Sequence, residues 1–276
     1  MIDEEEMNEE DYNNFMEGLR HETVELPAIM KAWIETASDY SKYNEIPAGL
    51  CFFNLLGQMC KDFVHIPDGD LTDDVRVHVC WIQTSGTGKS TMWRFVGPIS
   101  KSVFKKINEN AKHPPKVREL GQVSDTHFDL FSLVDYTDAA LVGYKDKKVI
   151  KNDEESEEHG SPIGDFYFER VAGALEGSGI AHWDEFEYSG IFKESQHKSS
   201  SIVYLNTLMN TLAGQNYRIT KQLAEGGEMY CDSRRSIYAT SYIPKTLTSV
   251  IAETGLLQRC LIYIREVPIS EQNAVR

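Results

Sequence analysis

The sequence predicts an α/β fold in which a central, mostly parallel sheet is flanked by helices and preceded by a helical N-terminal segment. Residues 75–82 form a β-rich and mostly apolar run, as expected for a strand buried on both faces of such a sheet. A glycine-containing loop follows directly, and a helical pattern begins near Ser90. Later apolar runs near 179–183, 235–241 and 260–264 are typical of further strands.

The chain is long enough for one principal core with a helical appendage, at 276 residues and 41% hydrophobic content. Two helices are expected between Leu26 and Val64, with a break near Pro47. A charge-rich insertion at about residues 144–160 is interpreted as a solvated surface hairpin or a mobile loop. The predicted units are an acidic, disordered tail at residues 1–20, a helical lead-in at 21–70 and the core at 71–276. The charged insertion lies within the core, at about 144–160.

Composition excludes several classes of protein. The net charge of −15 argues against a broad basic surface, so any contact with nucleic acid must use a few local Lys and Arg side chains. The five cysteines show neither a CxxC pair nor a metal-ligand spacing, and we expect reduced thiols. No apolar run approaches the roughly 20 residues needed to span a bilayer. We therefore expect a cytoplasmic protein with no membrane partner, in the host cytoplasm if the protein is viral.

Residues 83–90 read QTSGTGKS, which differs by one letter from the phosphate-binding pattern G-x-x-x-x-G-K-[ST]. Gln83 stands where the first glycine is usual, but the two remaining glycines keep the backbone permissive, and the following helix directs its N-terminus at an anion. Lys89 is expected to reach the β and γ oxygens of ATP, and Ser90 to ligate Mg²⁺. The expected ATP-binding residues are Thr84, Ser85, Gly86, Thr87, Gly88, Lys89, Ser90 and Thr91.

Two adjacent acids end the apolar run that begins at Gly179. Residues 179–187 read GIAHWDEFE, about ninety positions after the phosphate loop. A site that hydrolyses ATP divides its work between one carboxylate that holds Mg²⁺ and another that polarises water. We assign Asp184 to magnesium and Glu185 to water activation, while Glu187 stays open as a replacement for Glu185.

The strand expected from Arg235 onwards ends in small polar residues. A hydroxyl at the tip of a strand that lies between the phosphate-loop strand and the acidic strand can hold the attacking water and sense the γ-phosphate. Thr240 and Ser241 are both candidates for this catalytic role, and the sequence does not choose between them.

Taken together, these motifs identify a P-loop NTPase that resembles the AAA+ ATPases, and within them minichromosome-maintenance-type helicases and helicase-like ATPases of phages and plasmids. The similarity spans roughly residues 75–267. Residues 219–227, ITKQLAEGG, are similar to the hairpin that precedes the sensor strand in those helicases. Residues 257–262, LQRCLI, are similar to their arginine-finger segment. The chain departs from the family pattern at Gln83, at the sensor asparagine and at the aspartate of the arginine segment.

The resemblance implies an ATP-dependent nucleic-acid motor, a DNA helicase-type ring ATPase of a phage or other mobile element. It implies a homo-oligomer, expected as a hexamer, with ATP at subunit interfaces and with Arg259 acting on the nucleotide of the neighbouring subunit. Single- or double-stranded DNA would pass through the channel and contact Lys221, Arg234 and Arg235. Two alternatives stay open: a genome-packaging or protein-remodelling ATPase, and a nucleotide-binding switch or assembly factor that does not hydrolyse ATP.

Overall fold

The computed structural model describes most of the predicted core and its helical lead-in. The described residues are 25–41, 44–68, 71–110, 128–133, 137–149, 166–186, 201–210, 218–222, 228–243, 255 and 257–275. The tail at 1–20, the part of the charged insertion from 150 onwards, and Glu187 lie outside these ranges.

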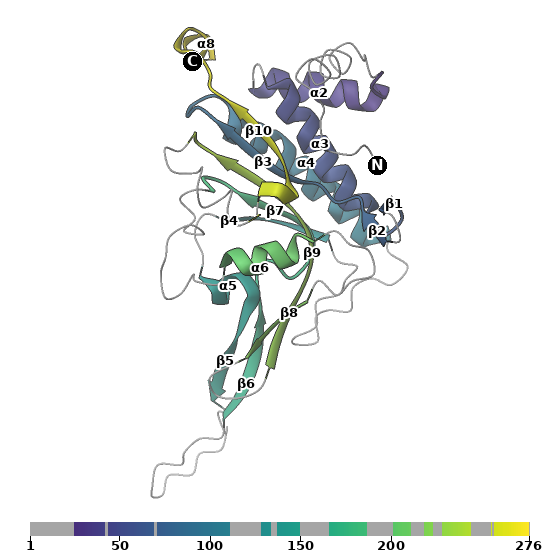
Figure 1. The fold of residues 1–276 in the computed structure, drawn as a ribbon, viewed down its shortest axis with the longest axis vertical. Helices are drawn as coiled ribbons and strands as arrows, with labels where there is room; N and C mark the ends of the chain where they lie inside the picture. Colours follow the sequence, from purple (N-terminus) through teal and green to yellow (C-terminus); the bar gives the residue numbers. More distant parts are fainter. Residues whose placement is uncertain are drawn as a thin grey trace, which may run out of the picture.

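A six-stranded, mostly parallel sheet forms the centre of the molecule, which confirms the predicted α/β class (Figure 1). Neighbouring strands in the order β10, β3, β9, β7, β4 are all parallel. A sixth strand, β8, pairs antiparallel with the first part of β9. Their bounds are β3 His78–Gln83, β4 Phe128–Leu133, β7 Gly177–Trp183, β8 Arg218–Gln222, β9 Glu228–Ser241 and β10 Cys260–Arg265.

The strand order places the three chemically interesting strands side by side. β9 lies between β3, which precedes the predicted phosphate loop, and β7, which precedes the paired acids. This is the position expected for the sensor strand. Because the five strands run in one direction, their C-terminal ends meet at one edge of the sheet, where open α/β sheets commonly bind their ligands.

Three helices cover one face of the sheet: α2 Ala28–Ser41, α3 Glu45–Cys60 and α4 Lys89–Asn110. Buried side chains of these helices pack against Val79, Trp81 and Tyr238 of the sheet. The break between α2 and α3 falls before Glu45, whereas it was expected near Pro47. Proline is tolerated there because it lies in the first turn of α3, where its missing N–H has no helical partner.

The opposite face is covered by α6 Ser201–Leu208 and the short helix α5 Asp138–Val142 (Figure 1). Their apolar side chains pack with Cys80, Ile82 and Ala239, which point to the face of the sheet opposite α2, α3 and α4. Every residue of β3 is buried as a result. Burial on both faces explains why this strand reads as a continuous apolar run in place of an alternating one.

Two antiparallel hairpins lie outside the central sheet. β5 Gly143–Val149 pairs with β6 Phe166–Ala172, and this hairpin projects from the body beside β8 and the beginning of β9 (Figure 1). The charged insertion therefore begins as a strand. β1 His65–Asp68 pairs with β2 Leu71–Asp74, a hairpin not expected within the helical lead-in. The chain continues past β10 into α8 Ile269–Val275.

All five cysteines are free thiols, as expected. Burial raises the pKa of Cys51, Cys80 and Cys231 to about 12, so these groups stay protonated and behave as small apolar side chains. Among the described residues, no helix is both long enough and apolar enough to cross a bilayer.

Two buried histidines make stability depend on pH. Burial lowers the pKa of His78 and of His182 from 6.5 to about 3. Between these values the unfolded chain binds a proton at each histidine and the folded chain does not. The free energy of unfolding should therefore fall as the pH drops from 6.5 towards 3, by about 1.4 kcal/mol per pH unit for each histidine.

Urea unfolding at several pH values between 7 and 4 tests this expectation. Carboxylates titrate in the same range, so the comparison is between the wild type and His182→Gln. The variant should lose stability less steeply with falling pH. Equal slopes would show that His182 is protonated in the folded protein or contributes nothing to the pH dependence.

Candidate functional site

The loop between β3 and α4 has the backbone geometry that its glycines permit. Gly86 and Gly88 have φ angles of 73° and 95°, in the region that disfavours other residues. A Cβ on Gly88 would lie 2.4 Å from the carbonyl oxygen of Ser41 at the end of α2, so that position requires glycine for space as well. A Cβ on Gly86 would meet nothing within 4 Å.

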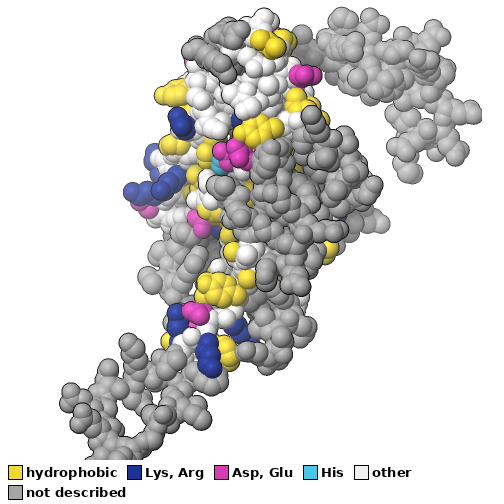
Figure 2. All heavy atoms as spheres, turned by 90° about the vertical axis from the view of Figure 1, so that its left-hand side faces the viewer, with side chains coloured by type: hydrophobic (Ala, Val, Ile, Leu, Met, Phe, Trp, Pro, Cys, Tyr) yellow, Lys and Arg dark blue, Asp and Glu magenta, His cyan; other side chains and the backbone are white. Residues whose placement is uncertain are grey.

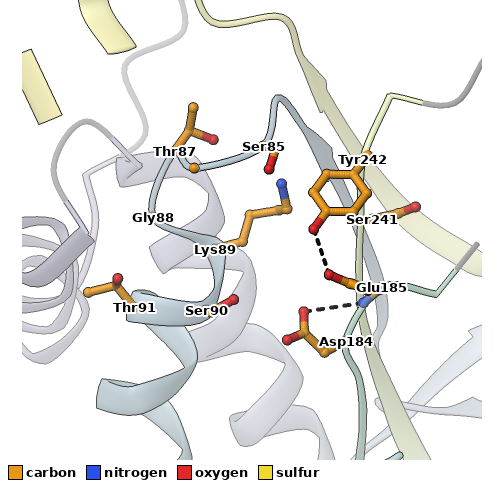
Figure 3. Close-up of a pocket in the computed structure, with 11 residues that line it drawn as sticks. Ser85, Thr87, Gly88, Lys89, Ser90, Thr91, Asp184, Glu185, Ser241 and Tyr242 are labelled. Carbon is orange, nitrogen blue, oxygen red and sulfur yellow. Dashed lines mark hydrogen bonds between the residues drawn. The ribbon is translucent and has the colours of Figure 1, made fainter. Parts of the chain in front are cut away.

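Lys89 begins α4 and folds back onto the loop (Figure 3). Its ammonium donates to the carbonyl oxygens of Gln83 at 2.6 Å and Thr84 at 3.1 Å. The side chain is only 7% exposed, so the loop holds a buried cation at the N-terminus of a helix. The helix dipole and this charge both favour an anion.

A cavity of about 190 Å³ separates the loop from the ends of β7 and β9. Seven of the eight residues expected to bind ATP line it, together with both acids. Thr84 does not, because its hydroxyl accepts a hydrogen bond from the backbone N–H of Val267 after β10. The lining residues are Ser85, Gly86, Thr87, Gly88, Lys89, Ser90, Thr91, Asp184, Glu185, Ser241 and Tyr242.

The two acids occupy the turn that ends β7, and β9 fixes this turn. The hydroxyl of Thr240 donates to Asp184 Oδ1 at 2.8 Å, and the N–H of Phe186 donates to the carbonyl oxygen of Thr240 at 2.9 Å. Glu185 has a φ of 51°, which a residue with a side chain adopts only at a cost of roughly 1–3 kcal/mol. The sheet therefore holds the acids in a defined and strained turn that faces the loop.

Tyr242 is a site residue that the sequence did not reveal. Its hydroxyl donates to Glu185 Oε1 at 2.6 Å, and its ring centroid lies 4.9 Å from Lys89 Nζ (Figure 3). The hydrogen bond to Glu185 raises the pKa of the phenol. Tyr242 thus joins the cation of the loop to the exposed carboxylate. The only available signal was its place directly after Thr240 and Ser241.

The structure separates the two sensor candidates. The hydroxyl of Thr240 is buried and contacts Asp184, so this residue orients the acid. Ser241 is also buried, but it lines the cavity. In Figure 3 the side chain of Ser241 points away from Lys89 and Glu185, whereas the hydroxyl of Thr240 contacts an acid of the site.

Three stacked aromatic rings connect the elements that carry the site residues. Trp93 of α4 lies flat on His182 of β7, with ring centroids 3.8 Å apart, and on Tyr238 of β9 at 5.3 Å. The stack joins the helix that begins with Lys89 to β7, which Asp184 follows, and to β9, which ends at Ser241. Aromatic contacts of this kind favour one relative placement of the elements that carry them.

The expected nucleic-acid contact at Arg235 is wrong. Its side chain is 4% exposed; it pairs with Asp129 and donates to the carbonyl oxygens of Glu176 and Ser178. The preceding residue of β9, Arg234, pairs with Asp62 at 2.7 Å near the surface. Arg235 lies on the core side because neighbouring residues of a strand point to opposite faces.

The hairpin expected around Lys221 is present, formed by β8 and the beginning of β9. The side chain of Lys221 lies outside the described residues. On the face shown in Figure 2, acidic, basic and apolar side chains are interspersed, and the described part shows no continuous basic area. Any contact with nucleic acid on this face would therefore be local.

Arg259 lies far from the loop of its own chain. It ends a short 3₁₀ turn before β10, and its guanidinium donates to the carbonyl oxygen of Gly255 at 2.9 Å. The parallel pairing puts Cys260 beside His78, the first residue of β3, whereas the loop follows Gln83, the last. Arg259 and the loop therefore lie at opposite edges of the sheet.

The donor set fits a magnesium ion that arrives with a nucleotide. Among the described residues, no group of three or more His, Cys, Asp or Glu side chains is arranged to hold a metal ion. Magnesium does not need one, because phosphates and water usually complete its shell beside one or two carboxylates. Asp184 and the exposed hydroxyl of Ser90 both line the cavity and supply the oxygen ligands that this ion prefers.

Comparison with known proteins does not identify a family. No protein-family model matches the chain, and no curated protein matches it.

The two adjacent arginines of β9 should respond differently to mutation. Arg235→Ala leaves Asp129 and buried carbonyl oxygens without their donor, and should lower the free energy of unfolding by about 3 kcal/mol or more. Arg234→Ala breaks a partly exposed pair and should cost about 0–1 kcal/mol. Urea unfolding of both variants measures the difference. Similar, small losses would contradict the buried role of Arg235.

Proposed function

We propose that the protein binds and hydrolyses ATP at the cavity between the loop and the ends of β7 and β9. One observation carries the proposal: a glycine loop with a buried lysine at a helix N-terminus faces two adjacent acids, one of them in a strained backbone conformation, across one cavity. The loop is suited to phosphates, and the acids are suited to a metal and a water molecule. Either half alone would also suit sites of other kinds, but their convergence favours triphosphate hydrolysis.

The loop would bind the phosphates through backbone N–H groups and Lys89. The lysine ammonium now donates to two carbonyl oxygens of its own loop. Phosphate oxygens carry negative charge, so they attract the ammonium group more strongly than neutral carbonyl oxygens do. Binding would therefore turn Lys89 from the loop carbonyls towards the β and γ phosphates.

Asp184 and Ser90 would hold magnesium, which when bound with the nucleotide supplies the positive charge that neutralises the phosphate oxygens. Thr240 keeps the Asp184 carboxylate in one orientation through its hydrogen bond. This assignment keeps the metal and the water on different acids, as the sequence suggested.

Glu185 would take the proton of the attacking water. Its carboxylate is exposed to the cavity and accepts a hydrogen bond from the hydroxyl of Tyr242. A water molecule needs the same acceptor oxygens, so Tyr242 competes with it or shares them. Tyr242 also contacts Lys89. Movement of the lysine towards phosphate would therefore alter the surroundings of the residue that holds Glu185.

Two substitutions test the assignment. Lys89→Ala should abolish measurable turnover and weaken ATP binding by at least about tenfold, because a charge-assisted contact is lost. Glu185→Gln should lower turnover by about a hundredfold or more and leave binding nearly unchanged. Phosphate release and nucleotide titration measure the two quantities.

Lys101→Ala is the matched control, because Lys101 is an exposed lysine on the same helix. Wild-type turnover in Glu185→Gln would show that another group activates the water. Tight ATP binding by the wild type without any turnover would favour a nucleotide-binding switch.

We further propose that hydrolysis drives a nucleic-acid motor of the ring helicase type. Two features support this extension. The hairpin of β8 and β9 continues from the same strand that carries Thr240 and Ser241, so one element links the site to a projecting surface. Arg259 lies at the edge of the sheet opposite its own loop, so a role in hydrolysis would require the site of a neighbouring subunit. A packaging or remodelling ATPase would share the site and differ in its partner.

Single-stranded DNA should stimulate ATP hydrolysis, and Lys221→Ala should reduce the ratio of the rates with and without DNA. The expected cause is the loss of a cation that contacts phosphate. Lys101→Ala should leave the ratio unchanged. An absence of stimulation by any nucleic acid would contradict the motor and leave the ATPase proposal standing.

A further inference from the structure

Gln83, the residue that replaces the usual first glycine, has a buried side chain beneath the loop. It is 1% exposed, and its amide lies among polar partners from three parts of the chain. Its Nε2 donates to Asn44 Oδ1 at 3.0 Å, to Thr87 Oγ1 at 2.8 Å and to the carbonyl oxygen of Thr87 at 3.2 Å. Its Oε1 accepts from the indole of Trp81 at 2.8 Å. The glutamine therefore supports the loop from the side away from the cavity.

The direction of these hydrogen bonds follows from one group. The indole N–H of Trp81 can only donate, so it fixes Oε1 of Gln83 towards itself and leaves the NH₂ group for Asn44 and Thr87. Asn44 must then accept with Oδ1 and donate with Nδ2. It does so to the carbonyl oxygens of Thr87 at 2.9 Å and Ser41 at 3.0 Å. The donors and acceptors match without conflict.

Asn44 belongs to the helical lead-in, thirty-nine positions before Gln83. It is the residue just before α3 and is 1% exposed. Together with Ser41, whose carbonyl oxygen leaves no room for a Cβ on Gly88, it holds the junction of α2 and α3 against the loop. Thr87 and Gly88, the two loop residues that precede the lysine, thus depend on this junction for their position.

We propose that the Asn44–Gln83 amide pair positions the phosphate loop, so that the helical lead-in is a working part of the nucleotide site. The inference rests on the proposed function and identifies two positioning residues for it. The phosphate-binding pattern would suggest that glycine at position 83 improves the loop, but the amide pair predicts the reverse. Restoring the usual glycine with Gln83→Gly should impair the site, because Trp81, Asn44 and Thr87 lose a buried partner.

The test measures the affinity for ADP and for a non-hydrolysable ATP analogue by calorimetry, with thermal unfolding of each variant without nucleotide. Gln83→Gly and Asn44→Ala should each weaken binding by about tenfold. The double variant should lose about as much as either single variant, because both residues belong to one network. Turnover at saturating ATP should change less than affinity.

Asn54→Ala is the matched control. Asn54 of α3 is also a buried asparagine, and it donates to the carbonyl oxygens of Val77, just before β3, and of Ile237, which lies level with the beginning of β3. Its loss should lower the unfolding temperature as Asn44→Ala does, with nucleotide affinity within about twofold of wild type. If Gln83→Gly does not fold, the nucleotide affinity of Asn44→Ala compared with that of Asn54→Ala tests the inference.

The outcomes separate the two proposals. Wild-type protein that binds no nucleotide, or that binds it equally well as Lys89→Ala, overturns the proposed function and this inference together. Wild-type binding that depends on Lys89, combined with unchanged affinity in Gln83→Gly and Asn44→Ala, overturns this inference alone. If Asn54→Ala loses as much nucleotide affinity as Asn44→Ala, the Asn44–Gln83 pair contributes only to general stability. That result would also overturn this inference.

Discussion

The parallel pairing of β9 with both β3 and β7 is the constraint on which the candidate site depends. It brings the loop after Gln83, the acids after Trp183 and the hydroxyls that end β9 to one edge of the sheet. The same strand then fixes the acidic turn through Thr240. The pairing is maintained by burial of both faces of the sheet, where two apolar clusters and the stack of Trp93, His182 and Tyr238 leave little freedom for one strand to shift.

Polar contacts set the finer geometry around this frame. Buried asparagine and glutamine side chains of α3 and its N-terminal neighbour donate to strand and loop carbonyl oxygens, so the lead-in helices have a fixed register on the sheet. A buried amide is costly without its partners, which makes such contacts specific. Inside the cavity, Tyr242 connects Lys89 with Glu185. The chemical groups of the site are therefore coupled to each other before any ligand arrives.

Much of this architecture could be predicted because it depends on local patterns. The apolar runs predicted β3, β7 and β9, and the order of motifs predicted that the strand of Thr240 lies between the other two. The role of Arg235 could not be predicted, since the side of a strand that faces the core depends on which helix covers it. Asn44 and Tyr242 were missed because their partners are distant in sequence, and a tyrosine or asparagine in a polar stretch has no distinctive pattern. The predicted domain limits and the insertion beyond Val149 stay predictions.

We propose that one cavity binds the triphosphate of ATP between the loop and the paired acids. A crystal structure with a non-hydrolysable ATP analogue and Mn²⁺, with the metal located by its anomalous scattering, tests it most directly. We expect phosphates against the backbone of residues 86–89, the metal between Ser90 and Asp184, and Lys89 turned away from the carbonyl oxygens of Gln83 and Thr84. Nucleotide bound elsewhere, or a metal that contacts neither Ser90 nor Asp184, would contradict it.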